Sequence, residues 1–251
     1  MKLRTLIFLI IVAVIILSVT GVISLSSLFG REDSSETVTM ERSFDADEFF
    51  KLEIEWAAGS VKIVPTESDE ITVQETKKSG NTQEMVTAYT GSKLTIRYAE
   101  GVNVNMANLS GKDLLIKVPQ NWSCDSLKIN GAALDIDVTD LKSGSVELSG
   151  AAAKLNYSGS VDQLKCDGAA AEVTLHSTNA PDSVSINGAA CKLDLTLPAG
   201  TGFAVTTDGV AVDFNSSASC TFSDNTYTHG DGSCEVKVSG LGCSVKVNHD
   251  K

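Results

Sequence analysis

Aromatic residues, prolines and histidines are scarce in this chain of 251 residues. Two tryptophans, Trp56 and Trp122, and four tyrosines are too few for the aromatic platforms expected of a polysaccharide-cleaving solenoid. The three histidines, His176, His229 and His249, are widely separated, and neither a His-x-x-x-His nor a Cys-x-x-Cys motif occurs. Because metal sites usually combine such ligands at short spacing, we expect no metal and three solvent-facing histidines.

Motifs of catalysis and cofactor binding are also missing. No Gly-x-Ser-x-Gly elbow is present, and no serine is paired with a histidine and an aspartate by any recognisable spacing. Asp224 and Asp231 lack the spacing of a calcium loop, and Asp135 and Asp137 fall on the outward side of a predicted strand. We therefore predict no catalytic, cofactor-binding or metal-binding residues, and a protein that is not an enzyme.

Positive charge is in short supply after the first 31 residues. All 32 acidic residues follow Arg31, whereas only 17 of the 20 basic residues do, which gives residues 32–251 a formal charge of −15. Nucleic acids and anionic lipid head groups repel such a surface. Nucleic-acid binding is thereby excluded, and the acidity fits a soluble, self-repelling surface.

One long hydrophobic run stands at the start of the chain. Lys2 and Arg4 precede the apolar stretch 6–19, and the apolar character continues to Leu25. About 20 apolar residues span a bilayer, so we expect residues 1–30 to be a transmembrane anchor, with a cleaved signal as the alternative. The basic residues before the run predict that everything after it lies outside the cytoplasm, in a single-pass membrane protein. Residues 31–37, REDSSET, are interpreted as a polar linker.

A glycine-centred segment with alternating apolar residues on both sides occurs six times between residues 127 and 247. The clearest copies are LKINGAALDIDVTD (127–140), VELSGAAAKLNY (146–157), LKCDGAAAEVTL (164–175) and VSINGAACKLDL (184–195), and the weaker ones are AVTTDGVAVDF (204–214) and VKVSGLGCSVKV (236–247). On both sides of each glycine, apolar and polar residues alternate with period two, which indicates half-buried strands. Each unit is predicted to be strand, bend, strand, with the turn glycines Gly131, Gly150, Gly168, Gly188, Gly209 and Gly240.

The spacing of these glycines favours a solenoid. They are 19, 18, 20, 21 and 31 residues apart, the last interval being lengthened by an insertion at 219–235. Asn, Asp or Ser precedes each glycine, a combination that tolerates positive φ and forms bends. Short regular units with aligned apolar positions predict an all-β solenoid, and an antiparallel rack of hairpins is the alternative. A phosphate-binding loop is excluded because strands, not helices, follow the glycines.

The region before the repeats is rich in strands but irregular. FFKLEIEWAAGSVKIVPTESDEITVQET (49–76) predicts three strands with a bend at Gly59, and SKLTIRYAE (92–100) and KDLLIKVPQNW (112–122) predict two more. We interpret residues 38–122 as the first, broader layers of the structure that residues 123–248 continue. Residues 38–248 are thus one exported β-repeat domain.

Six cysteines in an exported chain raise the question of disulfides. Cys166, Cys191 and Cys243 occupy apolar ladder positions, so we expect them to be buried thiols. Cys191 and Cys243 have equivalent positions, but the unit of Val212 lies between them in the sequence, which predicts that they are too far apart to bond. Cys220 and Cys234 flank the insertion, and a disulfide between them would stabilise by about 3 kcal/mol if unstrained.

Residues 40–248 resemble the bacterial putative-adhesin family of β-strand repeat domains, which includes LiaG-like envelope proteins. The resemblance rests on LEIEWAAGSVKIVPTESDEITV (52–73), LLIKVPQNW (114–122) and the Gly-Ala-Ala units that follow. It implies an extracytoplasmic domain, often tethered to the membrane and sometimes linked to envelope-stress modules. The family has no established mechanism and no catalytic residues to assign to this chain.

Three functional hypotheses follow. The first is a non-enzymatic, membrane-anchored cell-envelope scaffold or adhesin-like domain that binds an envelope protein or wall glycan. The second is an accessory regulator that senses envelope stress beside a membrane kinase or transporter. The third, an enzyme acting on polysaccharide, is disfavoured by the scarcity of aromatic residues.

Overall fold

The structure, a computed structural model, describes residues 37–100 and 111–250. The predicted transmembrane helix within residues 1–30 lies outside this part of the chain, as does most of the predicted linker. In the described ranges no helix is both long and apolar enough to cross a bilayer.

The described chain is almost entirely β-structure. A single 3₁₀ turn, η2 (Ala46–Glu48), interrupts the strands. The strands are β1 (Thr37–Asp45), β2 (Lys51–Glu55), β3 (Ala58–Thr66), β4 (Glu70–Lys78), β5 (Val86–Thr90), β6 (Lys93–Arg97), β7 (Lys112–Pro119), β8 (Ser123–Ser177), β9 (Ser183–Leu197), β10 (Phe203–Gly209), β11 (Val212–Ser216), β12 (Thr221–Ser223), β13 (Thr226–His229) and β14 (Cys234–His249).

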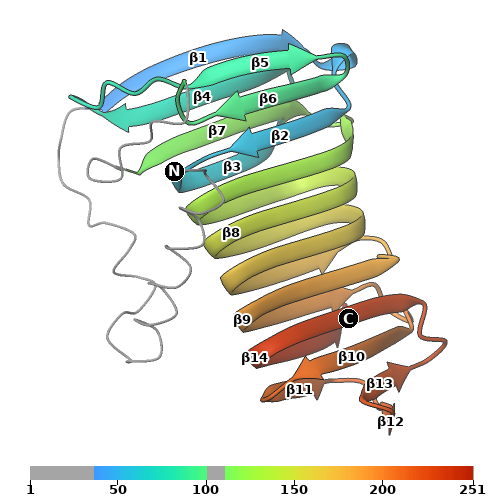
Figure 1. Ribbon diagram of the computed structural model, residues 1–251. Coiled ribbons are helices and arrows are strands. Elements are labelled where there is room, and N and C mark those ends of the chain that lie inside the picture. The colour runs from blue at the N-terminus through green and yellow to red at the C-terminus, as the bar shows by residue number, and fades with distance from the viewer. Residues whose placement is uncertain (1–36, 101–110, 251) are drawn as a thin grey trace.

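The repeats wind into a β-solenoid, which confirms the fold predicted from their spacing. β8 coils around the long axis in successive turns, here called rungs, and β9 and β14 continue the coil (Figure 1). Neighbouring rungs pair in parallel and in register: Val173 of β8 faces Leu193 of β9, which faces Val245 of β14. The antiparallel rack of hairpins is thereby excluded, because its repeats would pair in opposite directions.

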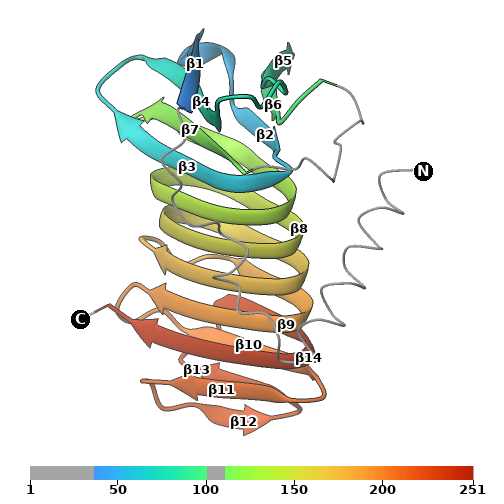
Figure 2. The same cartoon turned by 90° about the vertical axis from the view of Figure 1, so that its left-hand side faces the viewer.

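Each rung crosses two opposite walls of the solenoid. The first wall holds the segment before the repeat glycine, and the second wall holds the segment after it. β2 pairs with residues 126–130 on the first wall, and β3 pairs with residues 133–138 on the second. Beyond β2 the first wall ends with β6 and β5, and beyond β3 the second wall ends with β7, β4 and β1 (Figure 2). The strands at 49–76 thus form the broad end layers that the sequence predicts.

The alternating apolar residues fill the space between the walls. Leu127, Ile129, Leu134 and Ile136 of the first full rung are at most 1% exposed. Equivalent positions of the next three rungs are also buried, and most are Leu, Ile, Val, Ala or Cys. Each fully buried aliphatic side chain contributes about 1.5–3 kcal/mol, so this continuous interior stabilises the stack. A filled interior also means that the solenoid is not a channel.

The repeat glycines lie at the corners, but for a different reason than the sequence suggests. None of the six has a positive φ, so positive φ is not what selects glycine there. They stack instead: a Cβ added at Gly150, Gly168, Gly188, Gly240 or Gly209 would lie between 2.1 and 2.8 Å from the carbonyl oxygen of the adjacent rung's glycine. Real Cβ atoms do not approach a backbone oxygen so closely, so glycine permits the close approach of rungs at the corner.

The order of the last rungs differs from their order in the sequence. β14 pairs with β9 on one side and with β10 and β11 on the other. The chain therefore leaves one rung position open after β9, forms β10 to β13, and returns to fill the open position with β14. As a result the C-terminal residues lie above β11 and β12 instead of at the end of the stack (Figures 1 and 2).

Charged side chains on the outer surface connect adjacent rungs. On the first wall the Lys128 amine lies 3.1 Å from the Glu147 carboxylate. On the second wall Lys192 lies 2.7 Å from Glu172 and Lys246 lies 3.7 Å from Asp194. Exposed pairs of this kind contribute at most about 1 kcal/mol each, but they disfavour registers that bring like charges together.

Candidate functional site

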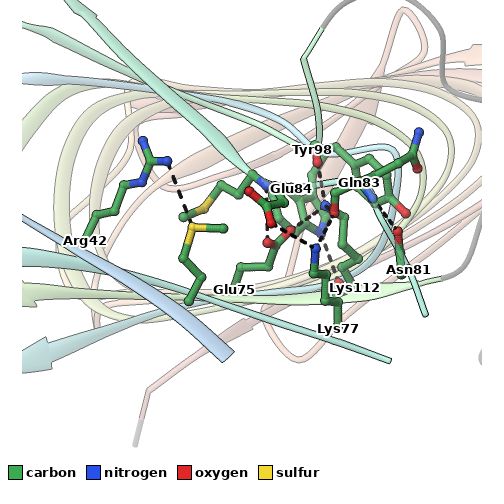
Figure 3. Close-up of polar contacts among 11 residues, drawn as sticks. Arg42, Glu75, Lys77, Asn81, Gln83, Glu84, Tyr98 and Lys112 are labelled. Carbon is green, nitrogen blue, oxygen red and sulfur yellow. Dashed lines mark hydrogen bonds and ion pairs between the residues drawn. The ribbon is translucent and has the colours of Figure 1, made fainter. Parts of the chain in front are cut away.

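The most polar buried site lies at the N-terminal end of the solenoid, under the loop that joins β4 to β5. Lys112, the first residue of β7, and Glu75 of β4 form an ion pair in which both side chains are fully buried. Figure 3 shows Lys112 surrounded by Glu75, Gln83 and Tyr98, with Lys77 and Glu84 close by. No other ion pair in the described residues is so completely removed from water.

Every proton of the Lys112 ammonium has an acceptor. The amine donates to Glu75 Oε1, to the carbonyl of Gln83 at 3.2 Å and to the carbonyl of Tyr98. The rings of Tyr98 and Trp56 also face it, with centroids 3.9 and 5.2 Å from Nζ. Burial lowers the pKa of Lys112, while the bond to Glu75 acts in the opposite direction. Saturation by three acceptors and two rings favours the charged form.

The partners of Lys112 are themselves held by hydrogen bonds. The Met85 backbone N–H donates to Glu75 Oε2 at 3.2 Å, and the Trp56 indole N–H donates to the Lys112 carbonyl at 3.0 Å. Lys77 donates to the carbonyl of Gln83 at 2.9 Å. Because each Lys112 proton has an acceptor and each Glu75 oxygen accepts a hydrogen bond, the pair is suited to fixing the β4–β5 loop over the core and not to attacking a substrate.

No prediction from the sequence included this buried ion pair, although the sequence carries a signal for it. In EITVQETKK (70–78) and KDLLIKVP (112–119), Glu75 and Lys112 have the same parity as the buried Ile71 and Leu114. Charged residues of opposite sign at inward positions of two strands indicate a buried pair. What the sequence could not supply is the pairing of β4 with β7 that brings these two residues together.

A shallow groove of about 210 Å³ runs across three rungs on the second wall. It is lined by polar residues of successive rungs, including Asp137, Asn156, Thr174 and His176. Asn156 donates to Asp137 at 2.8 Å, and His176 lies 3.5 Å from Asp250. The Tyr157 hydroxyl donates inward to the Leu141 carbonyl at 2.9 Å, and burial raises its pKa. The groove thus offers hydrogen bonds but no activated nucleophile.

The prediction that all three histidines face solvent is confirmed only for His176. His176 is half exposed beside Asp250. The expectation is wrong for His229 and His249, which are half-buried and meet across the fold with ring centroids 5.3 Å apart, both against Phe203. Each donates one ring N–H to a backbone carbonyl, His229 to Ser219 and His249 to Thr201. The insertion of β14 brings them together, which their sequence spacing could not reveal.

The cysteines are free thiols throughout the described chain. The possible disulfide between Cys220 and Cys234 is not present in the structure: Cys234 faces the core, whereas the Cys220 thiol donates to the Ala218 carbonyl at 3.5 Å. The predicted separation of Cys191 and Cys243 is wrong, because β14 lies directly beside β9 and makes them register partners. Burial raises the pKa of Cys191 and Cys234 to about 12, which makes both thiols poor nucleophiles.

Within residues 37–100 and 111–250, no group of three or more His, Cys, Asp or Glu side chains is arranged to hold a metal ion. The repeat glycines carry no ligand site either, because their stacked backbones leave no space at the corners. The six glycines, the cysteines and the buried ion pair are all explained by their structural environment.

Comparison with known proteins identifies the architecture. The family model described as Toastrack DUF4097 matches residues 49–240. No curated protein matches. A putative cell adhesion protein from Clostridium sporogenes has a similar structure, with 14% identity, a TM-score of 0.54, and coverage of 86% of this chain and 100% of the other.

Two further solved structures are more distant. A putative adhesin from Bacteroides fragilis shares 11% identity at a TM-score of 0.43, over 87% of this chain and 100% of the other. A putative lipid binding protein from Parabacteroides distasonis shares 12% identity at a TM-score of 0.41, over 85% and 97%. At such identities the likeness concerns the fold alone.

Proposed function

Because the chain belongs to the Toastrack DUF4097 family, we propose that it is a non-enzymatic, membrane-anchored cell-envelope protein whose solenoid is a surface scaffold or binding module. The observation that carries this proposal is where the fold places its charged, thiol and polar side chains. The buried Lys112 and Glu75 are hydrogen-bonded to protein groups, burial raises the pKa of Cys166 and Cys191, and the outer surface is a regular array of polar side chains. Such a surface suits recognition by many weak contacts.

The anchor is the second part of the proposal. Residues 1–30 hold an apolar run preceded by Lys2 and Arg4, which supports a single transmembrane helix with the solenoid outside the cytoplasm. The structurally similar protein from Clostridium sporogenes is described as a putative cell adhesion protein, which agrees with a role at the cell surface. The partner would be an envelope protein or a wall glycan.

Localisation and surface binding can be tested on the full chain. We expect it in the membrane fraction and accessible to protease added to cells stripped of their wall. A matched variant with residues 1–30 replaced by a cleavable signal peptide should be released into the medium with its solenoid intact. Retention of that variant in the membrane, or protection of the wild type from external protease, would contradict the anchor. Turnover of a glycan panel by the full chain would contradict the non-enzymatic role.

A further inference from the structure

The two walls of the solenoid end unevenly at the C-terminal end. β10 and β11 belong to the same rung, because both pair with β14. On the first wall β13 pairs with β10 and β12 pairs with β13, so this wall extends two strands further. On the second wall β11 pairs only with β14 among the described strands. β12 therefore lies beyond β11 at this end of the stack (Figures 1 and 2).

The inner side of the hairpin formed by β12 and β13 is aromatic. Tyr227 is the register partner of the buried Val205, and Phe222 is the register partner of Tyr227, so both side chains lie on the core side. Tyr227 stacks on Phe214 with centroids 4.3 Å apart, and Phe222 lies 4.5 Å from Tyr227. Phe222 remains 59% exposed. Phe214 covers Tyr227 from the second wall, but no described strand of that wall lies beyond β11 to cover Phe222.

We propose that a second copy of this chain covers it, in a two-fold symmetric end-to-end dimer. A rotation axis parallel to the strands exchanges the two walls, so the projecting hairpin of each copy fills the two missing strand positions of the other. Each copy has two extra strands on one wall and lacks two on the other. The two ends are therefore complementary in the number of strands on each wall. An isologous interface requires such self-complementarity.

The strand directions are compatible with this dimer interface, here called the joint. The chain reverses at each corner, so β10 and β11 run in opposite directions, and β12 runs parallel to β10 because two antiparallel pairings separate them. A rotation about an axis along the strands keeps their direction while it exchanges the walls. β12 of one copy therefore arrives beside β11 of the other in antiparallel orientation, which closes an open sheet edge on each copy.

Side chains fit the same register. With Phe214 opposite Phe222 of the second copy, Asp213 faces the Ser223 hydroxyl and Asn215 faces the Thr221 hydroxyl. Carboxylate and amide groups then meet hydroxyl groups, and no like charges are directly opposed. The nearest like charges are Asp213 and Asp224, one residue out of register, and residues 198–233 contain no Lys or Arg. Salt should therefore strengthen the dimer.

This inference rests on the proposed binding function and deepens it, because it names the partner as a second copy of the chain. The joint uses the end of the stack opposite β1, which follows the segment of the predicted anchor. It would leave both polar walls and the groove at His176 free.

The molar mass of the full chain in mild detergent tests the dimer. We expect twice the chain mass by light scattering, and a single-chain mass for Phe222→Glu, because a charge in the joint would be buried. Tyr89→Glu is the matched control: Tyr89 is an aromatic residue, 69% exposed, at the opposite end of the stack. A wild type of single-chain mass, or a Phe222→Glu variant that stays dimeric, would overturn the inference.

Cross-linking tests the register independently. A mixture of Asp213→Cys chains with Ser223→Cys chains should form a disulfide-linked dimer that neither variant forms alone. The matched control mixes Glu147→Cys with Lys165→Cys, two outward positions on the side of the stack, and should give none. Absence of the mixed dimer would overturn the joint. These readouts use purified protein, so a dimer without surface localisation would contradict only the proposed function, and a monomer at the surface only this inference.

Discussion

Gly240 and Gly242 lie two residues apart on β14 but differ in what surrounds them. A Cβ at Gly240 would lie 2.1 Å from the carbonyl oxygen of Gly188, whereas a Cβ at Gly242 would have nothing within 4 Å. Gly240→Ala should therefore lower the free energy of unfolding by about 2–3 kcal/mol, since the two rungs must separate. Gly242→Ala should change it by less than about 0.5 kcal/mol. Urea denaturation of both variants checks the difference, and equal effects would contradict the stacking explanation.

The buried ion pair predicts strong coupling between two residues. Lys112→Met leaves the Glu75 carboxylate without its partner, and Glu75→Leu leaves a buried ammonium, so each should cost about 3–5 kcal/mol. The double variant should recover most of this loss, because two apolar side chains of similar volume replace the pair. Denaturation of the two single variants and the double variant gives the coupling energy. The half-exposed pair Lys192 and Glu172 serves as control and should couple by less than about 1 kcal/mol.

At this scale the sequence identified which residues face inward but not which inward residues meet. Alternation alone placed Leu127, Ile136 and Val245 in the core, and all three are buried. The reason for glycine at the corners was wrong, because a close approach between rungs is a contact with another part of the chain. Alternation does not show which strands are neighbours, so it could not predict that Glu75 and Lys112 pair with each other.

Among the elements, β14 attaches the C-terminal strands to the rest of the solenoid. It is the only described element that connects β10 and β11 to β9 by backbone pairing. A chain that ends at Gly232 should therefore lose the order of residues 203–229, while β1 to β9 keep their pairings. Limited proteolysis should cleave the shortened chain within 203–229 and spare the remainder. A full chain with Lys246→Ala, a change on the exposed side of β14, is the control. Protection of 203–229 in the shortened chain would contradict the prediction.

The order of the elements was the least predictable feature. The interval of 31 residues before Gly240 indicated an insertion, yet it did not show that the chain would return to an open position. Rungs in a solenoid are nearly equivalent, so local patterns fit any order of stacking. The error had consequences at the residue scale, because it separated Cys191 from Cys243 and His229 from His249 in the interpretation.

For the molecule as a whole, the buried thiols predict how stability depends on pH. Burial raises the pKa of Cys124 to about 11 and that of Cys166, Cys191 and Cys234 to about 12, from 9.0. A raised folded-state pKa stabilises fully below the unfolded value and less as pH rises toward the folded value, because only the unfolded chain ionises. The free energy of unfolding should therefore fall by about 1.4 kcal/mol per pH unit for each thiol, from pH 9 to about 11 for Cys124 and to about 12 for the other three.

Cys166→Val isolates one of these thiols. The adjacent rungs carry Leu148 and Ile186 at the position of Cys166, and β14 carries Val238 there, so valine fits its surroundings. Between pH 8 and pH 11 the variant should lose about 2.5 kcal/mol less stability than the wild type. Urea denaturation at both pH values measures the difference, and identical losses would show that this thiol is not protected from ionisation by folding.

The placement of β14 also determines when, during synthesis of the chain, the fold can be completed. Synthesis runs from the N-terminus, so the strands that form the end of the stack emerge before the strand that attaches them to it. Until residues 234–249 have left the ribosome, β9 presents a full-length open edge, and residues 203–229 have no rung on which to assemble. Completion of this molecule must therefore wait for its last sixteen ordered strand residues, and a nascent chain paused before them would be the form most exposed to aggregation.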